Sequence, residues 1–248
     1  MSFQDHFSGH AADYAKARPG YPEALFDWLA NRAPGRALAW DAGCGNGQAS
    51  QALARHFRSV FTSDPSAAQI ESALPNLRIR FAVEPAEACS LQDASVDLVA
   101  VAQAYHWFDQ ERFCAEARRV LRPDGLVAVW SYARSSLSPE VDALVDALHD
   151  ETLAADWPAD REHVLNRYAN LPFAFERLPV PEFSMRERWV LAQYQGYLRS
   201  WSGSQRYRQR TGNDAVEAMA ADLAEAWGDP SQARDVQWPL LVLVGRAS

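Results

Sequence analysis

The stretch that decides the fold is Leu38-Ala39-Trp40-Asp41-Ala42-Gly43-Cys44-Gly45-Asn46-Gly47, an apolar run of strand length followed by a turn with three glycines. Gly43 and Gly45 allow the backbone to turn sharply and to pass close to a ligand. Apolar residues recur at helical spacing from 48 to 57, and the exposed amides at the start of such a helix favour a polar or anionic group. Residues 38–57 therefore predict a strand, a ligand-binding turn and a helix.

The same alternation of strand and helix extends outward from this unit. Helical periodicity occurs at 23–32, 48–57, 66–74, 110–121, 139–153 and 213–227. Strand-length apolar runs lie at 38–40, 60–62, 79–83, 96–102 and 126–130, and most are bounded by turn formers. Parallel strands need long crossovers, which helices supply. We therefore predict an α/β fold, with a doubly wound, mostly parallel sheet covered by helices on both faces.

The second half of the chain is less regular. Strands are expected near 178–190 and 236–245, where they would complete a seven-stranded sheet as antiparallel neighbours. A chain of 248 residues can bury its core in one domain. We expect a single domain over 1–248, with a cofactor-binding half at 1–134 and substrate-cap insertions and the last sheet strands at 135–248.

Composition and charge narrow the class of protein. The chain is 48% hydrophobic and carries a formal net charge of −8, which disfavours a general attraction for nucleic acid and leaves a small-molecule substrate as the favoured partner. No apolar segment is long enough to cross a bilayer, and residues 1–6 lack a secretory pattern, so we expect a cytoplasmic protein with no membrane partner. Three widely spaced cysteines predict reduced thiols and no metal site. The sequence indicates no oligomeric state.

Two acidic residues and the third glycine indicate which ligand the turn binds. A nicotinamide-binding turn would prefer a glycine where Gln48 stands, whereas here the third glycine is Gly47. Asp41 can accept a bond from an amide or pair with an ammonium, but it would repel a pyrophosphate. Asp64 ends the next strand about 20 residues on, where an acid takes the ribose hydroxyls of an adenosine. The pattern indicates a nucleoside that carries an amino acid; the alternative is that both acids only cap helices.

On these residues the chain resembles the class I S-adenosylmethionine-dependent methyltransferases, of the methyltransferase type 11 group, from the N-terminus to about residue 130. The resemblance implies S-adenosylmethionine as cofactor. It also implies that Asp41, Gly43 and Gly45 hold the methionine part, that Asp64 holds the ribose, and that Pro65 lies against the adenine.

The segment after the third strand departs from the family pattern. Many members carry an acid there in a Gly-Asp-Ala sequence, whereas this chain reads Glu84-Pro85-Ala86-Glu87. Proline offers no donor or acceptor side chain, so adenine recognition would pass to the Ala86 backbone and to Glu87. Gln103, directly after the fourth strand, completes the expected cofactor contacts.

The N-terminal lead-in contains Tyr14, Arg18-Pro19 and Tyr21-Pro22 ahead of the first expected helix. It resembles the lead-in of a subgroup of trans-aconitate methyltransferase-like enzymes. The resemblance implies that Tyr14 and Arg18 close over the cofactor. The alternative is that the prolines only set the entry angle of helix 23–32.

The acceptor is expected beside Tyr105-His106-Trp107, after the fourth strand. In-line methyl transfer chiefly requires alignment of donor and acceptor. A carboxylate acceptor needs no base, whereas a hydroxyl, amine or carbon acceptor usually does, and His106 is then the candidate catalytic base. The alternative is that His106 and Trp107 only pack and position the substrate.

An arginine-rich segment near the C-terminus resembles the substrate-cap segment of the same subgroup. It contains Arg199, Trp201 and Arg206, and no acid lies between Arg188 and Asp214. Guanidinium groups bind carboxylates with paired bonds, so these residues and Arg134, which follows the fifth strand, favour a carboxylic acid as acceptor. Solvated arginines are the plain alternative. Methylation of RNA or protein, or a non-catalytic S-adenosylmethionine-binding protein, also remains open.

Overall fold

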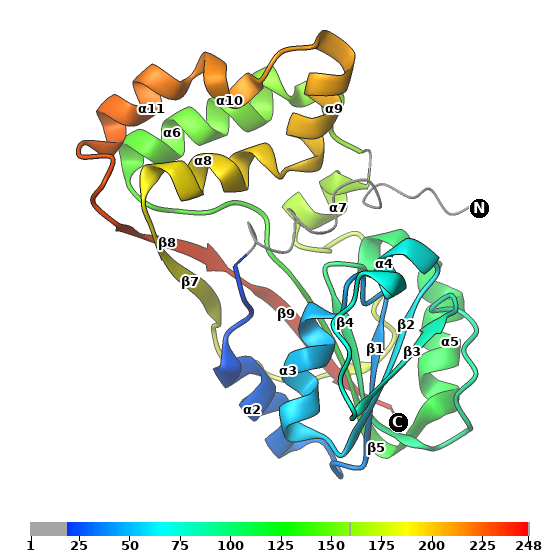
Figure 1. Ribbon diagram of the computed structural model, residues 1–248. Coiled ribbons are helices and arrows are strands. Elements are labelled where there is room, and N and C mark those ends of the chain that lie inside the picture. Colours follow the sequence, from blue (N-terminus) through cyan, green and yellow to red (C-terminus); the bar gives the residue numbers. More distant parts are fainter. Residues whose placement is uncertain (1–18, 159, 248) are drawn as a thin grey trace.

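The computed structural model describes residues 19–158 and 160–247, and its centre is a seven-stranded sheet in the order β3-β2-β1-β4-β5-β9-β6 (Figure 1). Strands β1 to β5 are parallel, whereas β9 runs antiparallel to β5 and β6 antiparallel to β9. The predicted fold class is therefore confirmed. The sheet strands are β1 (Leu38–Ala42), β2 (Ser59–Asp64), β3 (Ile79–Val83), β4 (Val96–Ala102), β5 (Leu121–Ser131), β6 (Glu176–Arg177) and β9 (Leu241–Arg246).

Helices cover both faces of this sheet. Along β4, Leu98 and Ala100 join the core beneath α2 (Glu23–Arg32) and α3 (Gln48–His56), whereas Val99 and Val101 join the core beneath α5 (Gln110–Val120). Successive side chains of a strand point to opposite faces, so a strand covered on both sides must be apolar at nearly every position. This burial accounts for the apolar run from Leu98 to Ala102 in β4. A shorter helix, α4 (Ala67–Glu71), follows β2.

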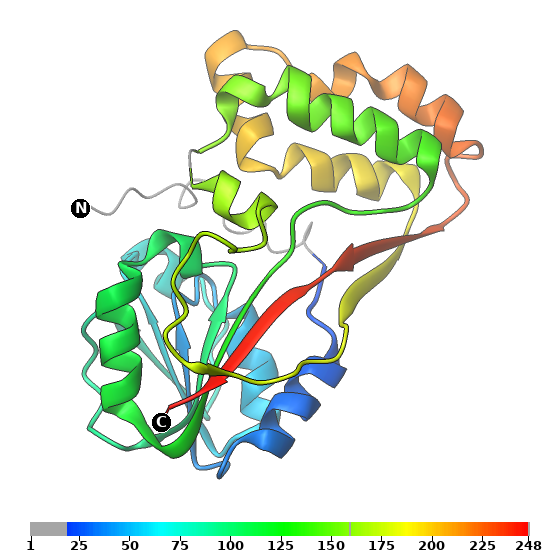
Figure 2. The ribbon, with the colours of Figure 1, turned by 180° about the vertical axis from the view of Figure 1, so that it is seen from behind.

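A group of five helices, which we call the cap, lies beyond the end of the sheet (Figures 1 and 2). Its members are α6 (Pro139–Ala147), α8 (Leu191–Arg199), α9 (Ser202–Thr211), α10 (Ala215–Ala218) and α11 (Ala220–Trp227). The carboxyl end of β5 continues through residues 132–138 to α6, so the cap stands over the carboxyl edge of the parallel strands. Four shorter helices complete the structure. η1 (Tyr105–Trp107) follows β4 and packs against α7 (Arg161–Leu165), whereas η2 (Leu148–Thr152) continues α6 and η3 (Ala154–Asp156) packs against α9.

The structure corrects the prediction for the second half of the chain. The strand expected within 178–190 does not join the main sheet; it is β7 (Ser184–Trp189), which pairs with β8 (Arg234–Pro239) in a separate antiparallel ribbon. Pro179 and Pro181 precede it, and proline cannot donate to a strand ladder. The antiparallel places in the sheet belong instead to β9 and to the two residues of β6.

Helix boundaries differ from the predictions in three places. The helix expected at 66–74 covers only 67–71, the one at 139–153 ends at 147 and continues as the wider turn of η2, and the one at 213–227 is interrupted at Met219. Helices α8 and α9, which contain the arginine-rich segment, were not predicted. None of the helices in the described ranges combines the length and apolarity that crossing a membrane requires.

Candidate functional site

The glycine-rich turn connects β1 to α3 and is bonded to the end of β2. Gly43 has a φ of 66°, and its N–H donates to the Ser63 carbonyl at 2.8 Å. A methyl group on its Cα would come within 2.8 Å of the Phe108 ring and 2.7 Å of the Ala104 side chain. Both the left-handed backbone and the close approach therefore require glycine at position 43.

Asp64, at the end of β2, is held against this turn. One carboxylate oxygen accepts the Gly45 N–H at 2.8 Å, and the other accepts the Ser66 N–H at 2.9 Å. The side chain is nearly buried, with 8% of the residue exposed. These two bonds hold the carboxylate at one orientation beside the turn, with Pro65 directly next to it in the chain.

Asp41, at the end of β1, is a buried acid with one unsatisfied oxygen. Ser50 donates its hydroxyl to Oδ2 at 2.5 Å, whereas Oδ1 has no hydrogen-bond partner among the described residues. Burial, with a smaller contribution from the charge of Asp64, raises the pKa of Asp41 from 3.8 to about 7. A buried acceptor without a donor is costly, and a cationic group beside it would restore the carboxylate. Asp41 therefore fits the ammonium of an amino acid.

Gln103 joins the carboxyl ends of β4 and β5. It has a left-handed backbone with φ of 56°, its N–H donates to the Trp130 carbonyl, and its side-chain amide donates to the Tyr132 carbonyl at 2.9 Å. Strained backbone of this kind gathers at functional sites. The side-chain donor of Gln103 is thus used to shape the edge on which the ligand would rest.

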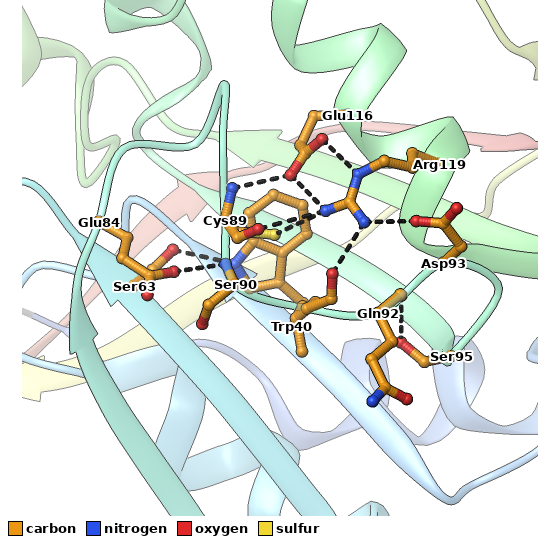
Figure 3. Close-up of polar contacts among 11 residues, drawn as sticks. Trp40, Ser63, Glu84, Cys89, Ser90, Gln92, Asp93, Ser95, Glu116 and Arg119 are labelled. Carbon is orange, nitrogen blue, oxygen red and sulfur yellow. Dashed lines mark hydrogen bonds and ion pairs between the residues drawn. The ribbon is translucent and has the colours of Figure 1, made fainter.

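The loop between β3 and β4 is fixed by Arg119 of α5 (Figure 3). The Arg119 guanidinium donates to Glu116 and Asp93, and to the carbonyls of Leu91 and Cys89. Glu116 in turn accepts the Cys89 N–H at 2.7 Å. Because one guanidinium binds both side-chain and backbone oxygens of residues 89–93, it holds this loop against α5.

Two glutamates at the start of this loop also act on the backbone. Glu84 accepts the Ser90 N–H at 2.8 Å, and Glu87 accepts the Asp109 N–H at 2.8 Å. Glu87 was expected to recognise adenine; in the structure its Oε1 accepts the N–H of Asp109, the residue that precedes α5. Ala86, between them, is 3% exposed.

His106 lies in η1, directly after β4. Its Nδ1 is 3.0 Å from the Tyr168 hydroxyl, and its ring contacts Trp107. Burial, followed by the charges of Arg161 and His163, lowers the pKa of His106 from 6.5 to about 3. The imidazole is therefore neutral and weakly basic near neutral pH, which fits positioning better than base catalysis.

The structure corrects the role expected for Tyr105. Its side chain is fully buried, its hydroxyl donates to the Pro172 carbonyl at 2.5 Å, and its ring packs edge-on against Phe113 and Tyr168. Tyr105 is therefore a core residue beneath the site. Tyr14 and Arg18, expected to close over the cofactor, lie outside the described residues.

The arginines expected to bind a substrate carboxylate are largely paired within the protein. Arg134 donates to Asp146 and Asp150 at 2.5 and 2.6 Å. Arg199 donates to Asp214 and Glu217 at 2.6 and 2.9 Å. The arginine-rich segment contains no acid, but folding brings Asp214 and Glu217 to Arg199. The expectation that Arg134 and Arg199 bind a substrate anion is therefore not supported.

The other two expected cap residues differ from each other. Trp201 is 2% exposed and packs against Tyr197 and Trp157, with ring centroids 5.7 Å apart in both pairs, so it belongs to the core of the cap. Arg206 lies on α9, where its charge helps to keep the pKa of Asp156 low. Within the described residues, no contact connects Trp201 or Arg206 to the glycine-rich turn.

Four residues that the sequence did not single out connect η1 to the cap. Arg161 stacks on the Trp157 ring at 4.6 Å and donates to the Ala133 carbonyl at 3.4 Å, at the carboxyl end of β5. Its helix packs against η1, and its charge lowers the pKa of both His106 and His149. Trp157, His149 and Tyr168 complete the connection. Their roles depend on contacts between segments that only the fold brings together.

Comparison with known proteins agrees with this geometry. A family model described as a methyltransferase domain matches residues 40–129. A protein of Dictyostelium discoideum, provisionally named a methyltransferase, is 30% identical over 98% of this chain and 95% of its own length. A probable S-adenosylmethionine-dependent methyltransferase of Saccharomyces cerevisiae is 33% identical over 56% of this chain and 50% of its own.

A solved structure extends the likeness to the whole fold. A protein of Anaeromyxobacter dehalogenans, provisionally named a type II methyltransferase, matches with a TM-score of 0.88 and 47% identity. The match covers 93% of this chain and 98% of that one. It therefore includes the cap as well as the sheet.

Proposed function

The chain belongs to the class I S-adenosylmethionine-dependent methyltransferases, and from that premise we propose that it methylates a small molecule held between the carboxyl edge of the sheet and the cap. The observation that carries this proposal is the position of the cap. It stands over the edge at which the glycine-rich turn and η1 lie (Figures 1 and 2). A covered edge favours a compact acceptor over a polymer.

The cofactor-binding roles of individual residues follow from the same geometry. Asp41 would hold the ammonium of the methionine part, the turn at 43–47 its carboxylate, Asp64 the ribose hydroxyls, and the segment 84–87 the adenine. S-adenosylmethionine supplies an electrophilic methyl group on a sulfonium. The protein's part is to orient the acceptor for in-line attack and to exclude water, because alignment is the main requirement of this displacement.

The structure gives no reason to restrict the acceptor to a carboxylic acid, which the arginine pattern had favoured. Arg134 and Arg199 are already neutralised by aspartate and glutamate, so they lend no support to a carboxylic acid. The net charge of −8 disfavours RNA. We propose a small molecule as acceptor, with His106 and Trp107 as positioning residues beside it.

A methyl-transfer assay on fractionated extract tests this proposal. The protein is incubated with S-adenosylmethionine carrying a tritiated methyl group and, separately, with ultrafiltered metabolites, total RNA and total protein. We expect enzyme-dependent label in the metabolite fraction, lost in Asp64→Ala. Label confined to RNA or protein would contradict the small-molecule proposal, and no label in any fraction would favour a non-catalytic binding protein.

A further inference from the structure

His149 is a buried histidine with one nitrogen bonded and the other unsatisfied. It lies in η2, which directly continues α6 of the cap, and is 2% exposed. Its Nδ1 is 2.8 Å from Oδ1 of Asp150, whereas its Nε2 has no hydrogen-bond partner among the described residues. Such an orphaned buried polar atom needs a structural or functional reason.

The partner at Nδ1 determines what Nε2 can do. Arg134 donates to the same Asp150 oxygen at 2.6 Å and holds it as a carboxylate, and an ionised carboxylate can only accept. Nη2 of Arg134 also lies 3.4 Å from Nδ1, but the contact of Nδ1 with Asp150 is much shorter, at 2.8 Å, so the proton between Asp150 and His149 sits on Nδ1. Burial holds the pKa of His149 below its ordinary value, so the ring stays neutral and Nε2 presents a bare lone pair.

The surroundings of the ring supply no donor for that lone pair. Trp157 stacks on one face of the imidazole, with centroids 4.4 Å apart, and Trp201 meets it edge-on at 5.9 Å. The indole N–H of Trp157 is used by the His149 carbonyl at 2.9 Å. The imidazole is thus oriented by aromatic contacts and by Asp150, while its acceptor atom is left for something outside the described side chains.

His149 is linked to the acceptor side of the site. Trp157, which stacks on the imidazole, also stacks under Arg161, and the helix of Arg161 packs against η1, where His106 lies. The charge of Arg161 lowers the pKa of both His106 and His149. Arg134, three residues after β5, contacts both His149 and Asp150, so the imidazole lies near the carboxyl end of β5, on the side where the proposed function places the methyl acceptor.

We propose that Nε2 of His149 receives a hydrogen bond from the methyl acceptor, so that the acceptor is a small molecule bearing an O–H or N–H group. This inference rests on the proposed function and names the substrate class for the same site. Asp150 acts as a positioning residue, since it selects the tautomer that accepts rather than donates. A carboxylate acceptor, which has no donor, would leave Nε2 unsatisfied.

Nitrogen-15 NMR of histidine-labelled protein tests the tautomer without requiring turnover. The chain has six histidines, and the His149 signals are assigned by their loss in His149→Gln. His56→Gln is the matched control, because His56 also meets a carboxylate, that of Glu23 at 2.9 Å, but lies on α3. We expect a protonated Nδ1 and a bare Nε2 at His149. A protonated Nε2 would overturn the proposal, because the nitrogen would then be a donor.

Binding is tested by titrating the same sample with phenol, which has an O–H donor, and with anisole, its methyl ether, which has none. We expect phenol to shift the Nε2 signal saturably and anisole to leave it in place. In Asp150→Asn, which keeps the imidazole but replaces the charged acceptor at Nδ1 by a neutral amide that can also donate, the apparent affinity for phenol should fall about tenfold, as the loss of one charge-assisted hydrogen bond implies. No shift with phenol, or an equal shift with anisole, would show a sealed histidine with no donor-binding role, whether or not the protein transfers methyl groups.

Discussion

Gly45 donates its backbone N–H to the Asp64 carboxylate at 2.8 Å, which ties the turn after β1 to the end of β2. Because β1 and β2 are adjacent and parallel, their carboxyl ends lie side by side, and the acid of one strand can bind the turn of the other. Contacts within the protein therefore join the turn and the acid at this edge. Several consequences can be measured.

Replacing Asp64 should weaken cofactor binding. Asp64→Asn keeps the shape of the side chain but replaces one acceptor oxygen by a donor, so we expect affinity for S-adenosylmethionine to fall about 30- to 100-fold, the equivalent of two to three kcal/mol. Calorimetry measures this directly. Asp124→Asn, at an exposed position in β5, is the matched control and should bind normally; affinity within about twofold of wild type in Asp64→Asn would remove Asp64 from the site.

Cofactor affinity should depend on the ionisation of Asp41. Its pKa in the free protein is about 7, and an ammonium ligand favours the carboxylate. We expect affinity for S-adenosylhomocysteine to be highest near pH 8, where Asp41 is ionised, and to fall as the pH drops below about 7. Asp41→Asn should bind weakly and without this pH dependence, and an unchanged pH profile in the variant would assign the titration to another group.

Asp41 should also make the stability of the cofactor-free protein depend on pH, but here the protonated side chain is the favourable form. The folded-state pKa of Asp41 lies above its ordinary value of 3.8, so the stability that its protonated form contributes is complete below pH 4 and is lost as the pH rises towards 7. Chemical denaturation should therefore find cofactor-free Asp41→Asn more stable than wild type at pH 8 by a few kcal/mol, with the two converging near pH 4. A variant less stable at pH 8 would contradict the buried-carboxylate account.

Arg119 should position the loop beside the adenine. Arg119→Ala removes the donor that binds Glu116, Asp93 and two carbonyls of that loop, so we expect cofactor affinity to fall about tenfold and the protein to lose about 1–2 kcal/mol of stability. Binding is measured by calorimetry and stability by denaturation. Arg188→Ala, which removes an exposed arginine from β7, should change neither. Normal cofactor affinity with lost stability would make Arg119 a purely structural residue.

His106 should not act as a general base. A base usually contributes about 10²–10⁴ in rate, whereas a neutral positioning residue contributes less. Once an acceptor is known, we expect His106→Gln to keep turnover within about tenfold of wild type, and the pH–rate profile to show no inflection that disappears in the variant. A loss of 1,000-fold or more, with such an inflection, would restore the base role, on the scale of general-base catalysis.

Local sequence was sufficient to predict that the glycine-rich turn and the two acids Asp41 and Asp64 lie at one edge of the sheet. Asp41, Gly43 and Asp64 are placed by the ends of strands and by one turn, all within 27 residues, so strand periodicity and turn chemistry were enough to predict them together. Glu87 shows the limit of that reasoning. Its identity suggested a ligand contact, but its partner is the Asp109 N–H, 22 residues away.

The residues expected around the acceptor could not be predicted in the same way, because their partners are distant in the sequence. The acids that neutralise Arg134 and Arg199 lie 12 to 18 residues away, and Asp156, which binds Arg210, is 54 residues away. Ion pairing of this kind is decided by how helices pack, and a count of charges within one segment does not reveal it. His149 was missed for the same reason, since only the fold shows that its Nε2 is left unpaired.

Calorimetric titration of the wild-type protein with S-adenosylhomocysteine, and separately with NAD, tests the central claim most directly. The glycine-rich turn with Asp41 and Asp64 predicts saturable binding of a single S-adenosylhomocysteine per chain and no binding of the dinucleotide, whose pyrophosphate meets two acids. No heat with S-adenosylhomocysteine, or equal affinity for NAD, would contradict the account.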